Sequence, residues 1–156
     1  MEFISENIID SVVEEIGTSE ENFTKALLEF SKEQPLLNTY ILSENFDIFT
    51  QSEKEYFLFL TLTLYFSVKN ENGELAEVTA EAIGKVEENN WTLLSEVKSK
   101  KFKERMDVFF ENYQQEDLLA FVEDSLIDDE DEIVTKVGRE PMFVALKSII
   151  DCLCAG

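Results

Sequence analysis

The sequence predicts a single all-α domain over residues 1–156, with about eight or nine helical segments around a buried central helix. Gly and Pro number only 5 and 2, which disfavours sandwiches and barrels that need many tight turns. Hydrophobic residues make up 44% of the chain, enough to build a core without disulfides or metals. Because successive helices of similar length follow one another, a short degenerate helical solenoid is the alternative.

The central helix is expected at residues 56–68, which read YFLFLTLTLYFSV and carry no charge. On a helical wheel their apolar side chains point in every direction, as in a helix enclosed by others. Alternation of side chains along the run leaves a strand as the alternative. Ser52 and Glu55 have the spacing of a capping box, which favours the helix. The run is too short to cross a bilayer, which takes about 20 apolar residues.

Two helices are predicted before this run. Residues 4–16 place their apolar side chains on one half of a helical wheel, and Gly17 follows as a stop. Thr18 and Glu21 have capping-box spacing for a second helix, which Pro35 ends. The connection between the two helices is very short, so they are expected to pack against each other.

The middle of the chain predicts further short segments. Residues 36–41 predict a short helix, and Ile48 and Phe49 in the following loop are expected to turn inward. Residues 74–88 separate into an apolar and a charged side, which predicts an amphipathic helix. Asn89 and Asn90 then offer a break before another short helix.

The last helix is expected to begin near Gly138, with Pro141 in its first turn. Lys147 and Asp151 have i, i+4 spacing and are expected on its solvent side. Two helices are predicted before it, at residues 102–113 and 118–126. The apolar stripe of the second of these consists of Leu118, Leu119, Val122 and Leu126.

The charge balance of the chain is extreme. It has 34 acidic and 13 basic residues, a net charge of −21. Such a field repels phosphate backbones and anionic membranes, so we expect neither direct nucleic-acid binding nor membrane association. A basic protein partner would be attracted, although the charge also keeps a chain with 13 Phe soluble. A homodimer that buries one Phe-rich stripe is a further alternative.

No sequence motif specifies a chemistry. The chain has no histidine, which removes every mechanism that uses imidazole as the base. It also has no Gly-rich phosphate loop, nucleophile elbow or zinc-spaced cysteine pair. We therefore expect no catalysis and no cofactor. Carboxylates are the groups that remain, and in pairs they can hold Mg²⁺ or Ca²⁺.

Two groups of carboxylates are weak candidates for binding. Glu74, Glu77 and Glu81 share one face of the predicted helix at 74–88, although such a stripe is usually only solvated. Residues 128–132 loosely resemble alternating calcium ligands, but an EF-hand loop would have Gly and Glu where Ile133 and Arg139 stand. The five carboxylates of this segment are Asp128, Asp129, Glu130, Asp131 and Glu132.

The segment 98–105, KSKKFKER, is the only basic patch in the sequence. It is a candidate for docking an anion or an acidic partner, and the alternative is that it balances nearby carboxylates. Its basic residues are Lys98, Lys100, Lys101, Lys103 and Arg105.

Cys152 and Cys154 are near neighbours in one helix, which disfavours a disulfide between them. Reduced thiols and an N-terminus without signal-peptide features predict a cytoplasmic protein.

Together these observations predict an acidic cytoplasmic protein that acts by binding another protein and performs no catalysis. The first alternative is an inhibitor or immunity-type protein that masks a basic nuclease or toxin surface. The second alternative, from a different functional class, is a carboxylate-dependent metal-binding enzyme.

Overall fold

A computed structural model of the chain describes residues 1–127 and 132–155, and this part is helical without strands. This confirms the predicted all-α fold. Eight α-helices and one short 3₁₀ helix occur in the described residues: α1 (Glu6–Gly17), α2 (Glu20–Glu33), α3 (Pro35–Ile41), η1 (Glu44–Phe46), α4 (Gln51–Asn72), α5 (Ala80–Ser95), α6 (Phe102–Phe110), α7 (Glu116–Ile127) and α8 (Lys136–Leu153).

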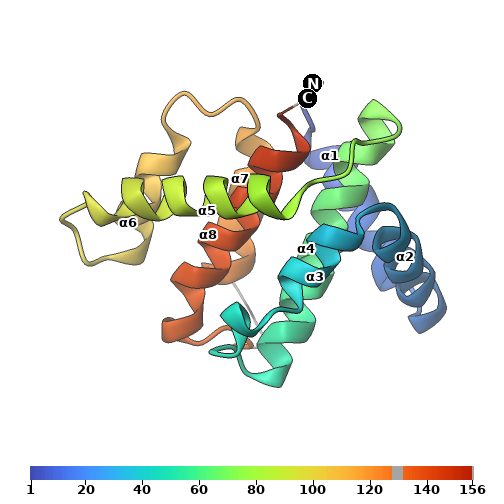
Figure 1. The fold of residues 1–156 in the computed structure, drawn as a ribbon, viewed down its shortest axis with the longest axis horizontal. Helices are drawn as coiled ribbons and strands as arrows, with labels where there is room; N and C mark the ends of the chain where they lie inside the picture. The colour runs from blue at the N-terminus through green and yellow to red at the C-terminus, as the bar shows by residue number, and fades with distance from the viewer. Residues whose placement is uncertain (128–131, 156) are drawn as a thin grey trace.

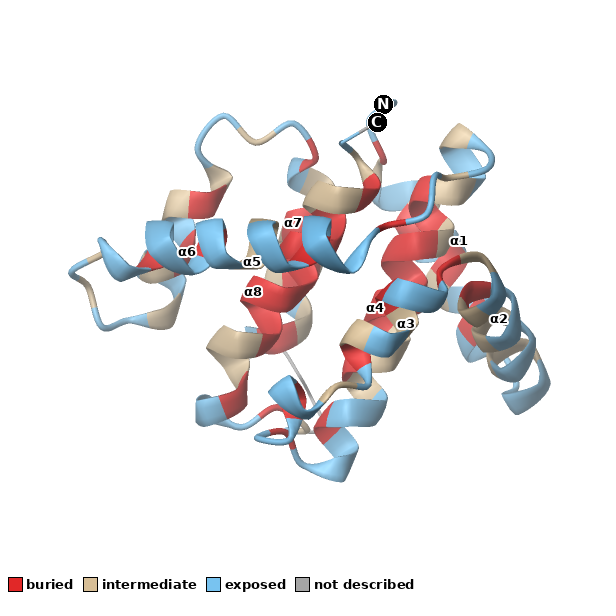
Figure 2. Ribbon diagram, viewed as in Figure 1, coloured by how far each residue is buried: buried red, intermediate tan, exposed pale blue. Residues whose placement is uncertain are grey.

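Two long helices, α4 and α8, lie against each other at the centre (Figure 1). In Figure 1, α5 crosses in front of α8, while α7 lies behind α8 and α1 lies behind α4. Buried residues concentrate on α4 and α8 (Figure 2), and residues 142–150 of α8 are all buried. The sequence predicted one enclosed helix, and the structure has two. Because α1 contacts both α4 and α7, the helices do not stack in sequence order as in a solenoid.

The helices α1, α2 and α3 agree with the predicted segments, apart from details of their ends. Ser19 caps α2, and its side chain accepts a hydrogen bond from Asn22 N at 3.1 Å. Thr18 was predicted as this cap, but its hydroxyl donates to the carbonyl of Glu14 instead. In the loop before α4, Phe49 is buried as expected, whereas Ile48 is 56% exposed, so its predicted inward position is wrong.

The capping box of α4 lies two residues earlier than predicted. Thr50 has an extended backbone, and its side chain accepts a hydrogen bond from Glu53 N at 3.1 Å. The Glu53 carboxylate in turn accepts from Thr50 N at 2.8 Å, which completes the box. The predicted pair, Ser52 and Glu55, already lies inside the first turn. At the other end, Gly73 has φ of 79°, the left-handed conformation in which glycine ends a helix.

The predicted helix over residues 74–88 is wrong for its first six residues, because α5 begins at Ala80 after a Thr79 cap. The buried side chain of Gln34 holds the residues just before α5 in a non-helical conformation. Its amide nitrogen donates to the carbonyl of Ala76 at 3.0 Å, and its amide oxygen accepts from Val78 N at 2.8 Å. Backbone groups used in this way are not available for helical hydrogen bonds.

The C-terminal helices also differ from the prediction in their boundaries. Asn89 and Asn90 do not interrupt α5, which continues to Ser95. The helix α8 begins before Gly138, because the side chain of Thr135 caps it and accepts a hydrogen bond from Gly138 N. Pro141 therefore lies inside α8, beyond the first turn, where its missing N–H removes one helical hydrogen bond.

The buried carboxylate of Glu53 joins the N-termini of α4 and α8. Glu53 is 1% exposed, and one of its oxygens forms the α4 capping box with Thr50. The other oxygen accepts from both the backbone N–H and the hydroxyl of Thr135, each at 3.0 Å. Both helix N-termini present partial positive charge to this carboxylate. Gly138 lies directly beside it, and a Cβ at this position would overlap the Glu53 carboxylate.

We predict opposite effects for two glycine-to-alanine substitutions. Gly138→Ala should lower the free energy of unfolding by about 1 to 3 kcal/mol, because the added methyl displaces Glu53 from its hydrogen bonds. Gly84→Ala, in the middle of α5, should raise it by about 0.5 to 1 kcal/mol, since nothing lies within 4 Å of its Cβ position. Urea denaturation of both variants measures these changes. Equal stability of Gly138→Ala and the wild type would contradict the proposed packing of Glu53.

Candidate functional site

The structure does not bring the predicted metal-ligating glutamates onto one helix face. Glu74 and Glu77 precede α5, Glu81 lies in its first turn, and all three side chains are exposed. Within residues 1–127 and 132–155, no group of three or more acidic or cysteine side chains is arranged to hold a metal ion. Of the second candidate group, residues 128–131 lie outside the described residues, and Glu132 is exposed.

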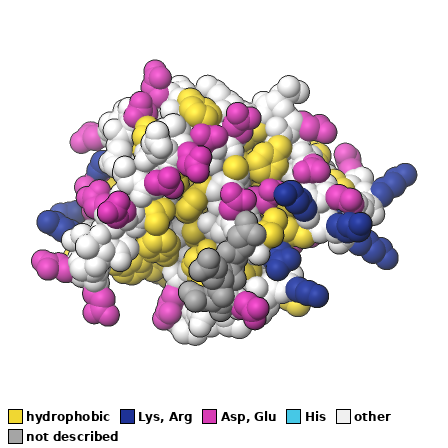
Figure 3. All heavy atoms as spheres, turned by 180° about the vertical axis from the view of Figure 1, so that it is seen from behind, with side chains coloured by type: hydrophobic (Ala, Val, Ile, Leu, Met, Phe, Trp, Pro, Cys, Tyr) yellow, Lys and Arg dark blue, Asp and Glu magenta, His cyan; other side chains and the backbone are white. Residues whose placement is uncertain are grey.

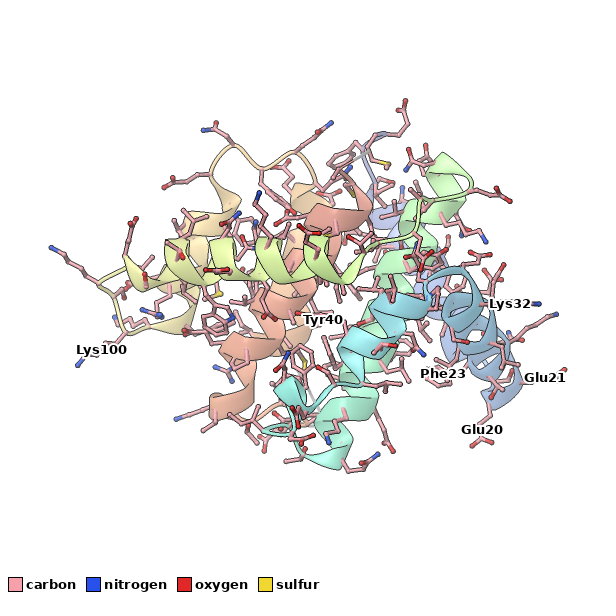
Figure 4. The ribbon with its side chains drawn as sticks, viewed as in Figure 1. Glu20, Glu21, Phe23, Lys32, Tyr40 and Lys100 are labelled. Atoms are coloured by element: carbon pink, nitrogen blue, oxygen red, sulfur yellow. The ribbon has the colours of Figure 1, made fainter. Side chains whose placement is uncertain are left out.

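The basic segment contains four exposed lysines and one arginine, Arg105, whose side chain forms hydrogen bonds within the fold. The guanidinium of Arg105 forms two hydrogen bonds with the Glu140 carboxylate, from Nε and Nη2, each at 3.0 Å. It also donates to the carbonyls of Val97 and Ser99, so it fastens this loop to α8. The four lysines are exposed, and Lys100 points away from the molecule in Figure 4. Arg105 is therefore engaged within the fold, unlike the other members of the predicted patch.

A charged cluster that the sequence did not predict lies between α5 and α8. Lys147 is 6% exposed, so its predicted position on the solvent side of α8 is wrong. Its ammonium contacts the Asp151 carboxylate at 2.7 Å and the side-chain oxygen of Asn90 at 3.0 Å. The same ammonium lies over the ring of Tyr113, whose hydroxyl donates to Asp151 at 2.5 Å. Asn90 also donates to the hydroxyl of Ser148 at 2.9 Å.

This cluster joins α5 to α8, because its polar side chains form hydrogen bonds with one another across the two helices. The sequence did contain one signal for it: Asn90 occupies a position in the apolar stripe of α5 that Ile83 and Leu94 continue, and both of these are buried. A polar residue inside such a stripe indicates a buried partner elsewhere in the chain.

Removal of the lysine from this cluster should destabilise the protein strongly. We expect Lys147→Met to lower the free energy of unfolding by about 3 kcal/mol, because it leaves the Asp151 charge without its cation. Lys147→Met/Asp151→Asn should recover part of this loss, and Lys85→Met, on the exposed face of α5, should change stability by less than about 0.5 kcal/mol. Denaturation curves of the three variants provide the comparison, and a loss for Lys147→Met no larger than for Lys85→Met would contradict the burial of this charge.

The ionised form of Glu123, on α7, is disfavoured by its surroundings in the folded protein. One of its oxygens is buried without a hydrogen-bond partner among the described residues. Burial raises the pKa of Glu123, and the nearby carboxylates of Asp107 and Asp124 raise it further, although Lys103 lowers it. The folded state therefore holds a proton on this carboxyl more tightly than the unfolded state, and stability falls as pH rises above the unfolded pKa.

Substitution of Glu123 should accordingly be stabilising near neutral pH. We expect Glu123→Gln to raise the Tm at pH 7 by a few degrees and to have little effect below pH of about 3, where the carboxyl is protonated in both states. Glu88→Gln, which is exposed on α5, makes the same change in net charge and should have a smaller effect. Thermal unfolding across this pH range measures the difference, and a gain that did not depend on pH would be evidence against ionisation as its cause.

The groove between α1 and α7 combines an apolar floor with acidic walls. Its volume is about 460 Å³. The floor is formed by Ile9, which is buried, and by the half-buried side chains of Tyr56, Ala120 and Phe121. Phe121 lies outside the apolar stripe that the sequence predicted for α7, and an aromatic residue off the buried stripe is a signal of this groove. The carboxylates that line the groove are Glu6, Asp10, Asp117 and Asp124.

The floor of this groove is held in place by hydrogen bonds between the helices. The backbone N–H of Glu6 donates to the Asp117 carboxylate at 3.1 Å, which joins α1 to α7. The hydroxyl of Tyr56 donates to the carbonyl of Ser125 at 2.8 Å, which joins α4 to α7. Figure 3 shows apolar atoms exposed in the middle of this face, with acidic side chains among and around them. Lys and Arg side chains lie mostly nearer the two sides of the same view.

A second groove, of about 470 Å³, lies between α1, α2 and α4 and has mixed charge. Its wall includes Lys69, whose ammonium binds the Glu33 carboxylate at 2.7 Å and Glu29 at 3.1 Å. Lys25 lines it as well. Because cations and carboxylates are both present, this groove selects no single sign of ligand charge. The α1–α7 groove is the better candidate for a binding site.

Comparisons with known proteins give no assignment for the chain. No protein family, curated protein or solved structure matches it. None of the helices in the described residues is long and apolar enough to cross a membrane.

Proposed function

We propose that this chain is a non-catalytic binding protein whose partner is a protein with a basic surface. The observation that carries the proposal is the excess of carboxylates that have no cation beside them. Thirty of the chain's 34 acidic residues lie in the part that the structure describes, whereas the ion pairs in that part involve five carboxylates. These five are Glu29, Glu33, Asp47, Glu140 and Asp151.

Unpaired carboxylates at this density favour association with a basic surface. Each one repels its neighbours, so the folded protein carries a self-repulsion that a cationic partner would relieve. The same field accelerates encounter with such a partner and rejects anionic ones. Solubility alone is served by a much smaller net charge than −21, since values of about 2 to 8 suffice for a small domain.

An inhibitor or immunity-type protein that covers a basic nuclease or toxin surface would bind through the same electrostatics.

Both cysteines are free, which fits the reducing environment of the cytoplasm. Burial raises the pKa of the Cys152 and Cys154 thiols to about 11, so neither is suited to nucleophilic catalysis.

The proposal predicts a salt-sensitive partner of high isoelectric point. The immobilised chain should retain a basic protein from a lysate of its source at low ionic strength and release it as the salt concentration rises. Beads carrying an unrelated acidic protein of similar net charge are the control for simple ion exchange. The retained protein, after purification, should bind at a fixed stoichiometry by calorimetry. Retention of the same proteins in the same amounts by both kinds of bead would contradict a specific partner.

A further inference from the structure

We propose that the α1–α7 groove is the docking site for a basic amphipathic helix of the partner protein. In this arrangement the apolar face of that helix covers Phe121 and Tyr56, and its lysines or arginines reach the carboxylates on both walls. The inference rests on the proposed function and adds the position of the interface and the chemistry of the segment that binds there.

The apolar floor is the first reason. Phe121 and Tyr56 pack against the core but, like Ala120, remain partly exposed, so some apolar area on α7 and α4 stays in contact with water in the isolated chain. Covering such area is favourable, and aromatic side chains contribute most of the energy at protein interfaces. The Tyr56 hydroxyl already bonds to Ser125, so its ring can be covered without leaving that polar group unsatisfied.

The arrangement of charge is the second reason, and it selects the sign of the occupant. Every charged side chain that lines the groove is a carboxylate. Glu6 and Asp10 lie one helical turn apart on α1, a separation of about 6 Å along the axis. Asp117 and Asp124 lie two turns apart on α7, about 10 Å along its axis. Cations on both flanks of a helix, at i, i+4 and i+7 spacing, would match these distances.

A second copy of the chain is a poorer occupant than a separate basic protein. Two copies would each bring a net charge of −21 to the contact, and this repulsion opposes the approach. The densest basic segment of a second copy, residues 98–105, has Arg105 engaged with Glu140. Self-association is therefore treated as one outcome of the experiment, and it would overturn the proposal.

The experiment uses three fluorescent peptides of equal length and the full chain. The probe is an amphipathic helix of about 14 residues with leucines on one face and lysines on both flanks. A lysine peptide without leucine tests charge alone, and a peptide with glutamate in place of lysine tests the apolar face alone. We expect the lysine–leucine peptide to bind most tightly, with an affinity that falls as salt rises, and the glutamate–leucine peptide not to bind.

Two matched double substitutions locate the binding site. Asp10→Asn/Asp124→Asn removes one carboxylate from each wall and should weaken binding of the lysine–leucine peptide by about five- to tenfold. Glu77→Gln/Glu88→Gln makes the same change in net charge at exposed positions that do not line the groove. This control pair should weaken binding less than twofold. Circular dichroism confirms that each variant is folded.

A third variant tests the floor. Ala120→Lys places a cation within the groove and should abolish binding of the lysine–leucine peptide. It should affect the lysine-only peptide less, because that peptide can use carboxylates elsewhere on the surface. If Ala120→Lys lowers stability, Ala120→Gln provides the uncharged comparison and should retain most of the affinity.

Each remaining outcome overturns the proposal in a distinguishable way. If the two double substitutions weaken binding equally, the interaction depends on overall charge. The assignment of the docking site to the groove is then wrong, whereas the proposed function stands. If neither cationic peptide binds at low salt, both the groove and the proposed function are wrong. If sedimentation shows a wild-type dimer that the Asp10→Asn/Asp124→Asn variant does not form, the groove binds a second copy of the chain.

Discussion

The Glu53 carboxylate fixes the two helices on which α1, α2, α5 and α7 pack. At 1% exposure a lone carboxylate would be strongly disfavoured, and hydrogen bonds from Thr50 and Thr135 offset that cost. Two of these donors are backbone N–H groups, so the contact sets the position of the main chain in both α4 and α8. Since α1 packs on α4 and α7 packs on α8, these two central helices also carry the elements that form the α1–α7 groove.

Periodicity predicted the helices that bury one face against their neighbours, but not the ends that distant side chains determine. Residues 74–79 have helical apolar spacing, yet their backbone groups bond to Gln34, a residue 42 and 44 positions earlier than its two partners. The sequence also predicts a helix break at Asn90, and this prediction is wrong because the partners that stabilise Asn90 inside α5 are distant in the sequence. Its partners Lys147 and Ser148 lie 57 and 58 positions later, and only the folded chain brings them together.

Composition predicted an acidic surface, but no local pattern predicted the position of the groove that we propose as the docking site. Glu6 and Asp10 belong to an ordinary polar face of α1, and the carboxylates of α7 are equally unremarkable in the sequence. The groove lies between α1 and α7, which contact each other and are joined by a hydrogen bond between residues that are 111 positions apart. Phe121 lies outside the apolar stripe predicted for α7, and its side chain packs at the edge of the core while it remains partly exposed.

The distribution of the few cations explains why the groove remains anionic. Lys69, Arg105 and Lys147 each pair with a carboxylate of another turn or another helix, so their charges are neutralised within the fold. The exposed lysines of residues 98–103 lie around the start of α6, and although Lys103 acts on Glu123 of α7, none of them lines the groove. At physiological salt, charges more than about 8 Å apart are largely screened. For the proposed basic partner, the net charge of −21 would therefore govern its approach, whereas the position of nearby carboxylates would decide where it binds.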